Sequence, residues 1–518
     1  MQQRVVNNLI NQNTLLAAIS KQAALNPQKQ AIEGLHYSLV YAELAEQVKQ
    51  TIALLNRLNH SVIGLFLENS PAWIVIDLAA QAVKKTVVPL PLFFSDDQLR
   101  HVIADAEIGL LFTDNPSRLQ NIALGFIEFD TQISHPNSLQ TEAISLFQQP
   151  QLADCNPDLI GVGKITYTSG TTGTPKGVCL SNASTLVTSE ALKTRTLASP
   201  DDRHLCLTPL STLLENIAGS YVPLLSGSTV IVLPSAKVGL QGASGLDIKQ
   251  LLSALINYQV SSAIVIPQML IALVSAIEAG MDRPKTLRFL AVGGAPVSEH
   301  LLARARRCKL PVFQGYGLSE CASVVAVNSP TENRIGSVGK PLPHLEVRFS
   351  KEGEILVKGA LFSGYLGSAA IKEGVFWPTG DLGYQDEAGY LWVTGRKKSL
   401  FITSFGRNIA PEWIESEFSL HPAIQQIVVF GEGRAWNCAV IVSQLLATAE
   451  GQSEIERLIN TVNQQLPDYA QIRQWIAAKA PFSVGNGQWT GTNRPRREPI
   501  FDVYKQDIEQ LYRNEDKR

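Results

Sequence analysis

Residues 168–177 form a segment in which hydroxyl side chains and glycines surround a single lysine, Lys176. Glycines let backbone N–H groups face an anion without a side-chain clash, the hydroxyl groups add hydrogen-bond donors, and the lysine adds a point charge. These are the groups that bind phosphate. Strand-like residues stand on both sides, at 164–167 and 178–180. The segment therefore predicts a phosphate-binding loop between two strands.

Two other interpretations of this segment are less favourable. The nucleotide-binding P-loop has four residues between its first glycine and a Gly-Lys-Ser/Thr triplet that opens a helix. Here Gly170 and Gly173 are closer together, and Gly177 follows Lys176. A surface linker rich in Ser, Thr and Gly is allowed by composition alone, but flexible linkers are not normally flanked by apolar strand-like runs.

The loop resembles the signature of the adenylate-forming superfamily, which includes acyl-CoA synthetases, peptide-synthetase adenylation domains and firefly luciferase. Other segments that resemble motifs of this superfamily follow in order along the chain, at 293–296, 315–320, 379–381 and 395–398. The resemblance covers roughly residues 165 to 500 and is closest in character to long-chain acyl-CoA synthetases. It implies an enzyme that activates carboxylic acids with ATP.

Adenylate formation, in which a carboxylate attacks the α-phosphorus of ATP, needs a site that brings two anions together and holds the nucleotide. The resemblance implies a small catalytic set, in which Glu320 would also hold Mg²⁺, because hard carboxylate oxygens suit this ion. The set consists of Thr168, Lys176, Glu320 and Arg494. The implied phosphate loop consists of Ser169, Gly170, Thr171, Thr172 and Gly173.

The later motifs contain candidates for the base and the ribose. Tyr316 stands between two glycines, which let a ligand approach closely, so its ring could stack on adenine; a core tyrosine is the alternative. Ser319 could bind the α-phosphate, although a Ser-Glu pair also suits a helix cap. Asp381 offers acceptor oxygens to ribose hydroxyls or occupies a turn. The implied set is completed by Gly294, Ala295, Pro296, Gly317, Arg396, Lys398 and Gly406.

Arg494 marks a departure from the family pattern. Relatives carry a lysine in this C-terminal segment, which bridges the substrate carboxylate and the α-phosphate, and no lysine occurs between Lys479 and Lys505. Arginine keeps the charge but replaces a compact ammonium by a longer planar fork, so the adenylation step is expected to be impaired. The alternative is that residues 494–497 form a solvated basic patch that meets coenzyme A phosphates.

The chain length and the hydrophobic pattern predict an α/β fold. At 518 residues and 45% hydrophobic residues, the chain is too long for one core and can bury large ones. Apolar runs at 61–67, 229–233 and 262–266 predict buried strands, and the spacing at 72–83 and 248–258 predicts helices between them. The resemblance implies a large N-terminal α/β domain and a small, mobile C-terminal α+β domain.

The domain boundary is expected at the glycine and three cations of residues 395–398. These residues alone fit an ordinary turn as well as an exposed hinge. The resemblance favours the hinge, with Lys398 at the position about which the C-terminal domain rotates between adenylation and thioester formation. It implies an AMP-binding domain at 1–394, a hinge at 395–399 and a mobile domain at 400–518.

Charge and cysteine content restrict the partners. The net charge of -2 predicts no strong attraction to nucleic acid or to an anionic membrane. The six cysteines lack the paired spacing of zinc or redox motifs, which predicts reduced thiols in the cytoplasm. No apolar run has the length of a membrane span and the N-terminus lacks a secretory signal, so membrane contact would be peripheral.

The acyl site is expected near Thr212, where many acyl-CoA synthetases carry a histidine or an aromatic residue. No aspartate occurs between Asp202 and Asp247 to pair an α-ammonium group, which disfavours amino acid substrates. Gly317 replaces the tryptophan that closes the pocket of acetate-activating relatives. Medium-chain or long-chain fatty acids are therefore expected, with aryl acids left open. Apolar residues that would suit an alkyl chain are Ile217, Tyr221, Val222, Leu224 and Leu225.

The sequence does not determine which molecule accepts the acyl group. Residues 404–408 resemble the loop that swings into the active site for thioester formation, where Gly406 would leave room for a pantetheine arm; a plain turn is the alternative. The arm could belong to coenzyme A or to an acyl carrier protein. We expect a fatty acyl-CoA synthetase. The alternatives are an acyl-AMP ligase that loads a carrier protein or an amine, and a nucleotide-binding homologue with impaired adenylation.

Overall fold

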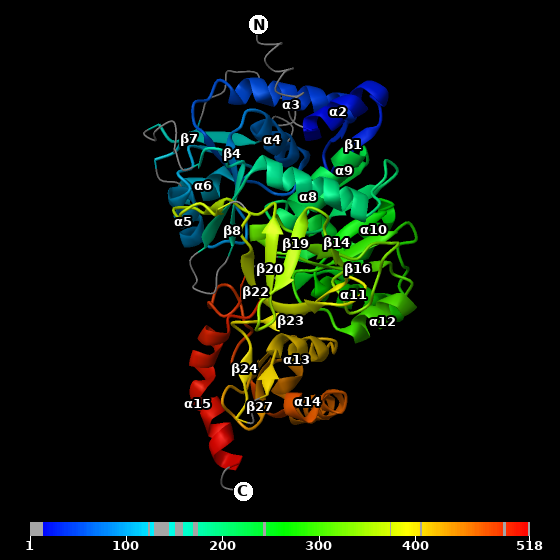
Figure 1. The fold of residues 1–518 in the computed structure, drawn as a ribbon, viewed down its shortest axis with the longest axis vertical. Coiled ribbons are helices and arrows are strands. Elements are labelled where there is room, and N and C mark those ends of the chain that lie inside the picture. Colours follow the sequence, from blue (N-terminus) through cyan, green and yellow to red (C-terminus); the bar gives the residue numbers. More distant parts are fainter. Residues whose placement is uncertain are drawn as a thin grey trace.

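The structure is a computed structural model that describes residues 14–122, 125–128, 144–150, 159–168, 175–241, 245–372, 374–404, 407–490 and 494–515. Figure 1 shows a wide upper part at the N-terminal end and a narrower lower part that holds the C-terminal helix α15 (Arg497–Glu515). None of the helices in the described ranges is both long and apolar enough to cross a bilayer.

One sheet of the upper part has eight strands in the order β21-β9-β8-β4-β3-β5-β7-β6. Strands β3, β4 and β5 run parallel and are buried along their whole length, because their residues are almost all apolar or β-branched. The strands are β3 (Val62–Phe66), β4 (Thr86–Pro89), β5 (Leu110–Thr113), β6 (Ile127–Glu128), β7 (Ser145–Gln148), β8 (Lys164–Thr168), β9 (Lys176–Leu180) and β21 (Gly364–Tyr365).

A second sheet has nine strands in the order β18-β17-β16-β15-β14-β10-β11-β1-β2. Its central strands are parallel, so their carboxyl ends meet at one edge, where ligands of α/β proteins bind. The strands are β1 (Gln30–Gly34), β2 (Ser38–Val40), β10 (Arg203–Cys206), β11 (Thr229–Val232), β14 (Ser262–Val265), β15 (Phe289–Val292), β16 (Val312–Tyr316), β17 (Ala326–Val327) and β18 (Lys340–Pro341).

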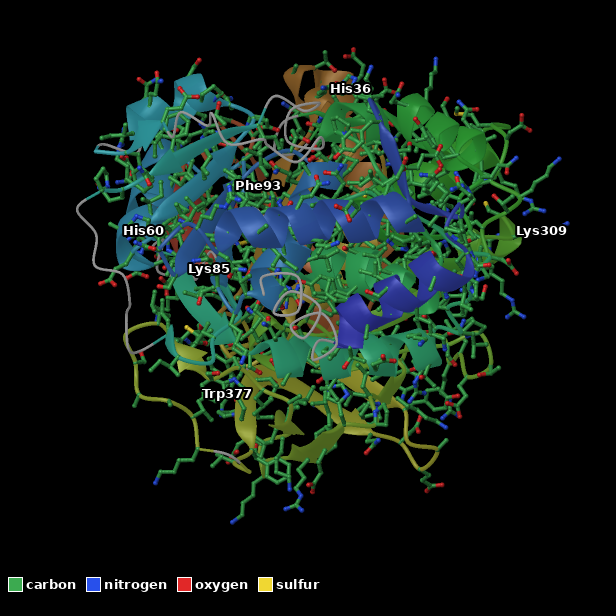
Figure 2. The ribbon with its side chains drawn as sticks, turned by 90° about the horizontal axis from the view of Figure 1, so that it is seen from above. His36, His60, Lys85, Phe93, Lys309 and Trp377 are labelled. Carbon is green, nitrogen blue, oxygen red and sulfur yellow. The ribbon has the colours of Figure 1, made fainter. Side chains whose placement is uncertain are left out.

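Helices fill the space between and outside these sheets. The largest hydrophobic cluster contains residues of both sheets and of α4, a helix that is buried along its whole length. Figure 2 looks down on this end of the molecule, where α2 and α3 cross the top side by side. The helices here are α2 (Thr14–Leu25), α3 (Tyr41–Leu55), α4 (Pro71–Ala82), α5 (Asp96–Asp105), α6 (Pro116–Ile122), α8 (Asn182–Arg195) and α9 (Val222–Ser226).

The opposite face of the nine-stranded sheet carries a separate hydrophobic cluster. The helices that contribute to it are amphipathic, and their apolar sides pack on the sheet. They are α10 (Ile248–Asn257), α11 (Pro267–Glu278) and α12 (Glu299–Arg307).

The predicted strands and helices are confirmed: 61–67 contains β3, 229–233 contains β11 and 262–266 contains β14, while the helical spacings match α4 and α10. The phosphate-loop segment also lies between two strands, as predicted. Strands β8 and β9 pair antiparallel, with Thr168 opposite Lys176.

The lower part begins after a four-stranded antiparallel sheet made of β19 (Leu345–Phe349), β20 (Glu354–Gly359), β22 (Trp377–Gln385) and β23 (Leu391–Arg396). Below it, a three-stranded sheet packs with helices, an α+β arrangement with its own hydrophobic clusters. Its elements are α13 (Pro411–Phe418), β26 (Gln426–Phe430), β27 (Asn437–Val442), α14 (Ala449–Asn463), β28 (Ile472–Ala477) and α15. The α/β class with a small α+β C-terminal part is confirmed, and the boundary at 395–399 stays a prediction.

Candidate active site

A cavity of about 1940 Å³ opens at the carboxyl ends of β14, β15 and β16 and reaches into the C-terminal part. It brings together predicted site residues that are far apart in the sequence. Those that line it are Thr168, Lys176, Gly294, Ala295, Pro296, Tyr316, Gly317, Ser319, Glu320, Asp381, Arg396, Lys398 and Arg494. The other predicted residues lie outside the described ranges: Ser169, Gly170, Thr171, Thr172, Gly173 and Gly406.

Asp381 is the centre of a hydrogen-bonded group in this cavity. Its carboxylate accepts a hydrogen bond from the Tyr316 hydroxyl at 2.8 Å and one from Nε of Arg396 at 2.8 Å. The residue is only 5% exposed. Burial raises the pKa of Tyr316, as does the nearby Asp381 charge, so the phenol stays protonated and donates. Each carboxylate oxygen still has a lone pair that can accept a ribose hydroxyl.

Glu320 lies in a short 3-10 turn, η4 (Ser319–Cys321), directly after β16. Its Oε1 accepts a hydrogen bond of 2.7 Å from the hydroxyl of Tyr365. Lys176 approaches the ring of the same tyrosine, with Nζ 6.0 Å from the centroid. A carboxylate that keeps lone pairs free and faces a cavity fits a Mg²⁺ ion shared with phosphate oxygens.

Tyr365 was not among the residues predicted from the sequence. It stands outside the recognisable motifs, and it reaches the site only because β21 pairs with β9, the strand that begins with Lys176. Burial raises the pKa of its hydroxyl, so it acts as a donor toward Glu320. An aromatic residue in a short strand carries no signal of this role in the sequence.

Gly317 needs to be glycine for a backbone reason. A Cβ atom at this position would lie 1.8 Å from the carbonyl oxygen of Ser323. The turn that creates this contact contains Ala322 and Ser323, both with a left-handed backbone, at φ values of 48° and 83°. The absence of a tryptophan at Gly317 therefore follows from local packing and gives no independent measure of the acyl pocket.

Arg494 reaches from the C-terminal part into the cavity. Its Nε and Nη2 atoms donate to the carbonyl oxygen of Gly294 at 3.1 and 2.5 Å. A turn holds its backbone, since Thr490 and Arg494 exchange hydrogen bonds of 2.8 and 2.9 Å. Burial and the positive charge of Arg396 lower the pKa of Arg494. A guanidinium group has five donors, so three remain for an anion.

The alternative of a solvated basic patch at 494–497 is wrong. Arg497 lies inside the C-terminal part, where Nη2 donates to Glu415 at 2.6 Å and Nη1 donates to the Val429 carbonyl at 3.0 Å. Arg497 therefore has a structural role inside the C-terminal part, whereas Arg494 faces the cavity and binds Gly294.

The predicted hinge contains a second paired cation besides Arg396. Lys397 Nζ lies 2.8 Å from Oε2 of Glu354, whose other oxygen accepts the backbone N–H of Gly380 at 3.1 Å. This contact joins the residues after β23 to β20 and to β22, the strand that contains Asp381. Glu354 was not predicted as a site residue.

The cavity also continues as an internal channel along the nine-stranded sheet. Ala291 is the partly exposed residue of the otherwise buried strand β15. Ala218 is likewise the partly exposed residue of a buried π-helix, η2 (Glu215–Tyr221). Both line the cavity together with Ile264 and Val222. Small side chains in the middle of buried elements leave an apolar passage beside the nucleotide end.

The acyl residues expected from the sequence are only partly correct. Thr212 and Val222 line the cavity. The others are buried in the core instead, and Tyr221 donates a hydrogen bond of 2.5 Å to Asp77, the partner of the buried Lys164. Those that belong to the core are Ile217, Tyr221, Leu224 and Leu225. Apolar residues in a run cannot be divided into core and channel by sequence pattern alone.

Family comparison assigns the class. The AMP-binding enzyme family matches residues 19–366, and the AMP-binding enzyme C-terminal domain matches residues 398–516. The chain belongs to the AMP-binding enzyme family. It is an AMP-forming acyl-CoA ligase, a class that uses ATP, Mg²⁺ and coenzyme A.

Curated relatives act on different acids. The long-chain-fatty-acid–CoA ligase FadD15 of Mycobacterium bovis is 26% identical over 93% of this chain and 94% of its own. A 2-succinylbenzoate–CoA ligase of Bacillus licheniformis is 28% identical over 87% of this chain and 93% of its own. The relatives therefore agree on the coenzyme A ligase class and differ in the acid.

Solved structures of low identity share the fold. The anthranilate CoA ligase AuaEII in complex with anthranoyl-AMP has a TM-score of 0.77 at 16% identity and covers 95% of this chain and 97% of its own. The O-succinylbenzoate coenzyme A synthetase of Bacillus subtilis with ATP and magnesium has a TM-score of 0.72 at 22% identity, over 93% of this chain and 98% of its own. These likenesses confirm the predicted fold.

Proposed function

We propose that this ligase activates medium-chain or long-chain carboxylic acids through an acyl-AMP intermediate and transfers the acyl group to coenzyme A. The observation that carries the choice of acid is the internal channel beside Ala291 and Ala218. From Gly293 to Phe289 the channel wall extends by four residues, or about 13 Å at about 3.3 Å per residue. A passage of this length suits an extended chain better than a compact aryl group.

The cavity residues supply what the adenylation step needs. Lys176 and the preceding loop would hold the phosphates, and Asp381 would accept the ribose hydroxyls. Glu320 would hold Mg²⁺, which when bound neutralises charge on phosphate oxygens. The three free donors of Arg494 would bind the carboxylate and the α-phosphate as charge redistributes between them. Positioning both anions in one place is the main contribution of such a site.

The second step requires a thiol to reach the acyl-adenylate. We propose that residues 395–399 act as the hinge that lets the C-terminal part change position, with Lys398 at its centre and Gly406 beside the pantetheine arm. Coenzyme A is the acceptor in the relatives, and none of the similarities reported above favours a carrier protein.

Carboxylate-dependent release of pyrophosphate from ATP tests the proposal. The protein would be supplied with Mg²⁺ and with straight-chain acids of increasing length, aryl acids and amino acids, each with and without coenzyme A. Release that peaks at one medium or long chain length, with acyl-CoA as the product, is the expected result. A peak with aryl acids would contradict the choice of acid, and acyl-AMP that never passes to coenzyme A would contradict the acceptor.

Arg494 supports a second candidate, a nucleotide-binding homologue that adenylates weakly. Two donors of its guanidinium group already bind the Gly294 carbonyl oxygen. A lysine at this position would have a compact ammonium group in place of this planar fork, so it would not make the same two-donor contact. ATP binding measured by calorimetry, without pyrophosphate release for any acid, would favour this candidate over the ligase.

A further inference from the structure

The distal end of the channel is polar. Strand register places His204, Ser262 and Phe289 in one row across β10, β14 and β15, at the amino ends of these strands. The next row on the same face contains Ile264 and Ala291. The channel therefore passes from the nucleotide end along apolar walls to a row in which two of the three side chains form hydrogen bonds.

A buried carboxylate fixes the hydrogen atoms in this row. Oε2 of Glu215 accepts the backbone N–H and the hydroxyl of Thr208 at 2.9 and 2.6 Å. Oε1 lies 3.2 Å from Nε2 of His204, a geometry that fits a ring hydrogen on Nε2 donated to the carboxylate. Nδ1 then accepts the hydroxyl hydrogen of Ser262 at 3.0 Å. The Ser262 oxygen keeps its lone pairs, and the residue is partly exposed to the cavity.

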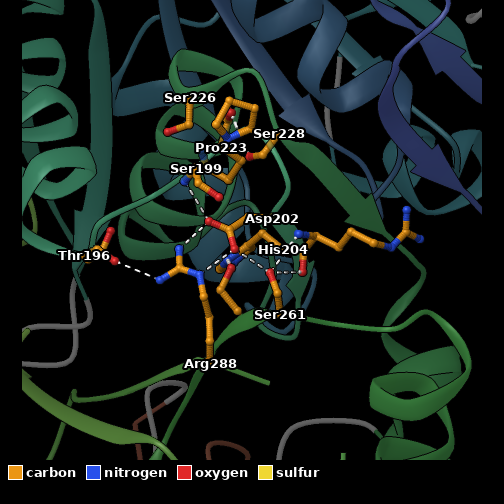
Figure 3. A network of polar contacts seen from close by, with 12 residues as sticks. Thr196, Ser199, Asp202, His204, Pro223, Ser226, Ser228, Ser261 and Arg288 are labelled. Atoms are coloured by element: carbon orange, nitrogen blue, oxygen red, sulfur yellow. Dashed lines mark hydrogen bonds and ion pairs between the residues drawn. The ribbon is translucent and has the colours of Figure 1, made fainter. Parts of the chain in front are cut away.

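Further polar groups lie just before the same strands, and Figure 3 shows the hydrogen bonds and ion pairs that join them. Asp202 accepts Nε of Arg288 at 2.6 Å, the Ser199 backbone N–H at 2.8 Å and the Ser261 hydroxyl at 2.8 Å. Nη1 of Arg288 donates to the Thr196 carbonyl at 3.0 Å. These bonds hold Asp202 in place, and the Ser262 oxygen is an acceptor that lines the cavity beside them.

We propose that Ser262 binds a hydroxyl group carried by the acyl chain, with His204 as the residue that positions it. This inference rests on the proposed function and narrows its substrate class to hydroxylated medium-chain or long-chain acids, with the hydroxyl about 13 Å from the carboxyl end. A methyl terminus at this row would cover a polar oxygen without replacing its hydrogen bonds to water, whereas a hydroxyl donates to it. Selection by a hydrogen bond in a buried pocket discriminates more sharply than selection by length.

The experiment compares straight-chain acids with their terminally hydroxylated equivalents of the same length. The ratio of kcat/KM for the two acids is measured by pyrophosphate release in the wild type, Ser262→Ala and Ser262→Thr. We expect the wild type to favour the hydroxy acid, Ser262→Ala to lower the ratio about tenfold, and Ser262→Thr to restore part of it. The matched control is Ser220→Ala, a buried serine of η2 that does not line the cavity, which should keep the wild-type ratio.

A wild type that favours unsubstituted acids, or a ratio that Ser262→Ala leaves unchanged, would overturn the inference. Titration calorimetry with each acid in the absence of ATP measures binding without turnover. Tighter binding of the hydroxy acid, lost in Ser262→Ala, would support the inference even if no pyrophosphate were released and the proposed function failed. Equal binding of the two acids would overturn it even if the proposed function held.

Discussion

The two ends of the cavity are built in different ways. At the nucleotide end, charged and hydroxyl side chains come from strands and from the turn that holds Glu320, and Asp381, Tyr316 and Arg396 form one hydrogen-bonded group. At the acyl end, the wall consists of ordinary strand and helix residues in which Ala291 and Ala218 leave space. The nucleotide end therefore depends on the functional groups that its side chains carry. The acyl end depends on small side chains that leave part of the core unfilled.

This difference predicts where single substitutions act. A change at the nucleotide end should affect every acid equally, because the nucleotide is common to all of them. A change at the acyl end should alter the preference among acids and leave ATP binding intact.

Arg494→Ala should slow adenylation of all acids by about a thousandfold, because it removes the donors that meet the charge developing between carboxylate and α-phosphate. Single-turnover formation of acyl-AMP measures this step. Thioester formation from supplied acyl-AMP serves as the control and should change little. Arg494→Lys should raise adenylation above the wild type if a compact ammonium is the better group; an unchanged or lower rate would show that the arginine is well accommodated.

Asp381→Ala should weaken ATP binding by about a hundredfold, since it removes the ribose acceptor and leaves Arg396 and Tyr316 without their common partner. Titration calorimetry with ATP measures the change, and the order of preference among acids should stay the same. Asp386→Ala is the matched control, because this residue pairs with Arg334 outside the cavity. A changed preference among acids in Asp381→Ala would contradict the separation of the two ends.

The nucleotide end of the cavity could be predicted from the sequence better than the acyl end. The motifs at the nucleotide end could be predicted because glycines, hydroxyls and charges at fixed spacing have few structural roles. The acyl end could not, because Ile217, Val222 and Leu224 have the same pattern and all pack in the core, but of the three only Val222 also lines the cavity. Tyr365 and Glu354 were missed as well, since each reaches the site through pairing of strands that are far apart in sequence.

Ala291→Leu should lower kcat/KM for long acids by about thirtyfold and for short acids much less, because the larger side chain fills the channel that a long chain needs. Pyrophosphate release across a series of chain lengths measures the shift. The affinity for ATP is the internal control and should match that of the wild type. An equal loss of kcat/KM for all chain lengths would indicate damage to the sheet. An unchanged preference among chain lengths would show that the acyl chain does not pass Ala291.

Tyr365→Phe should weaken the apparent affinity for Mg²⁺ by about tenfold, because the 2.7 Å hydrogen bond that orients the Glu320 carboxylate is lost while the ring beside Lys176 remains. The measurement is the Mg²⁺ concentration that gives half of the maximal pyrophosphate release, for a short and a long acid. Since burial raises the pKa of this hydroxyl, the protonated donor persists at pH 7 to 9, and the wild-type Mg²⁺ requirement should not change over that range through this group. An effect confined to the long acid would assign Tyr365 to the acyl end and break the proposed division.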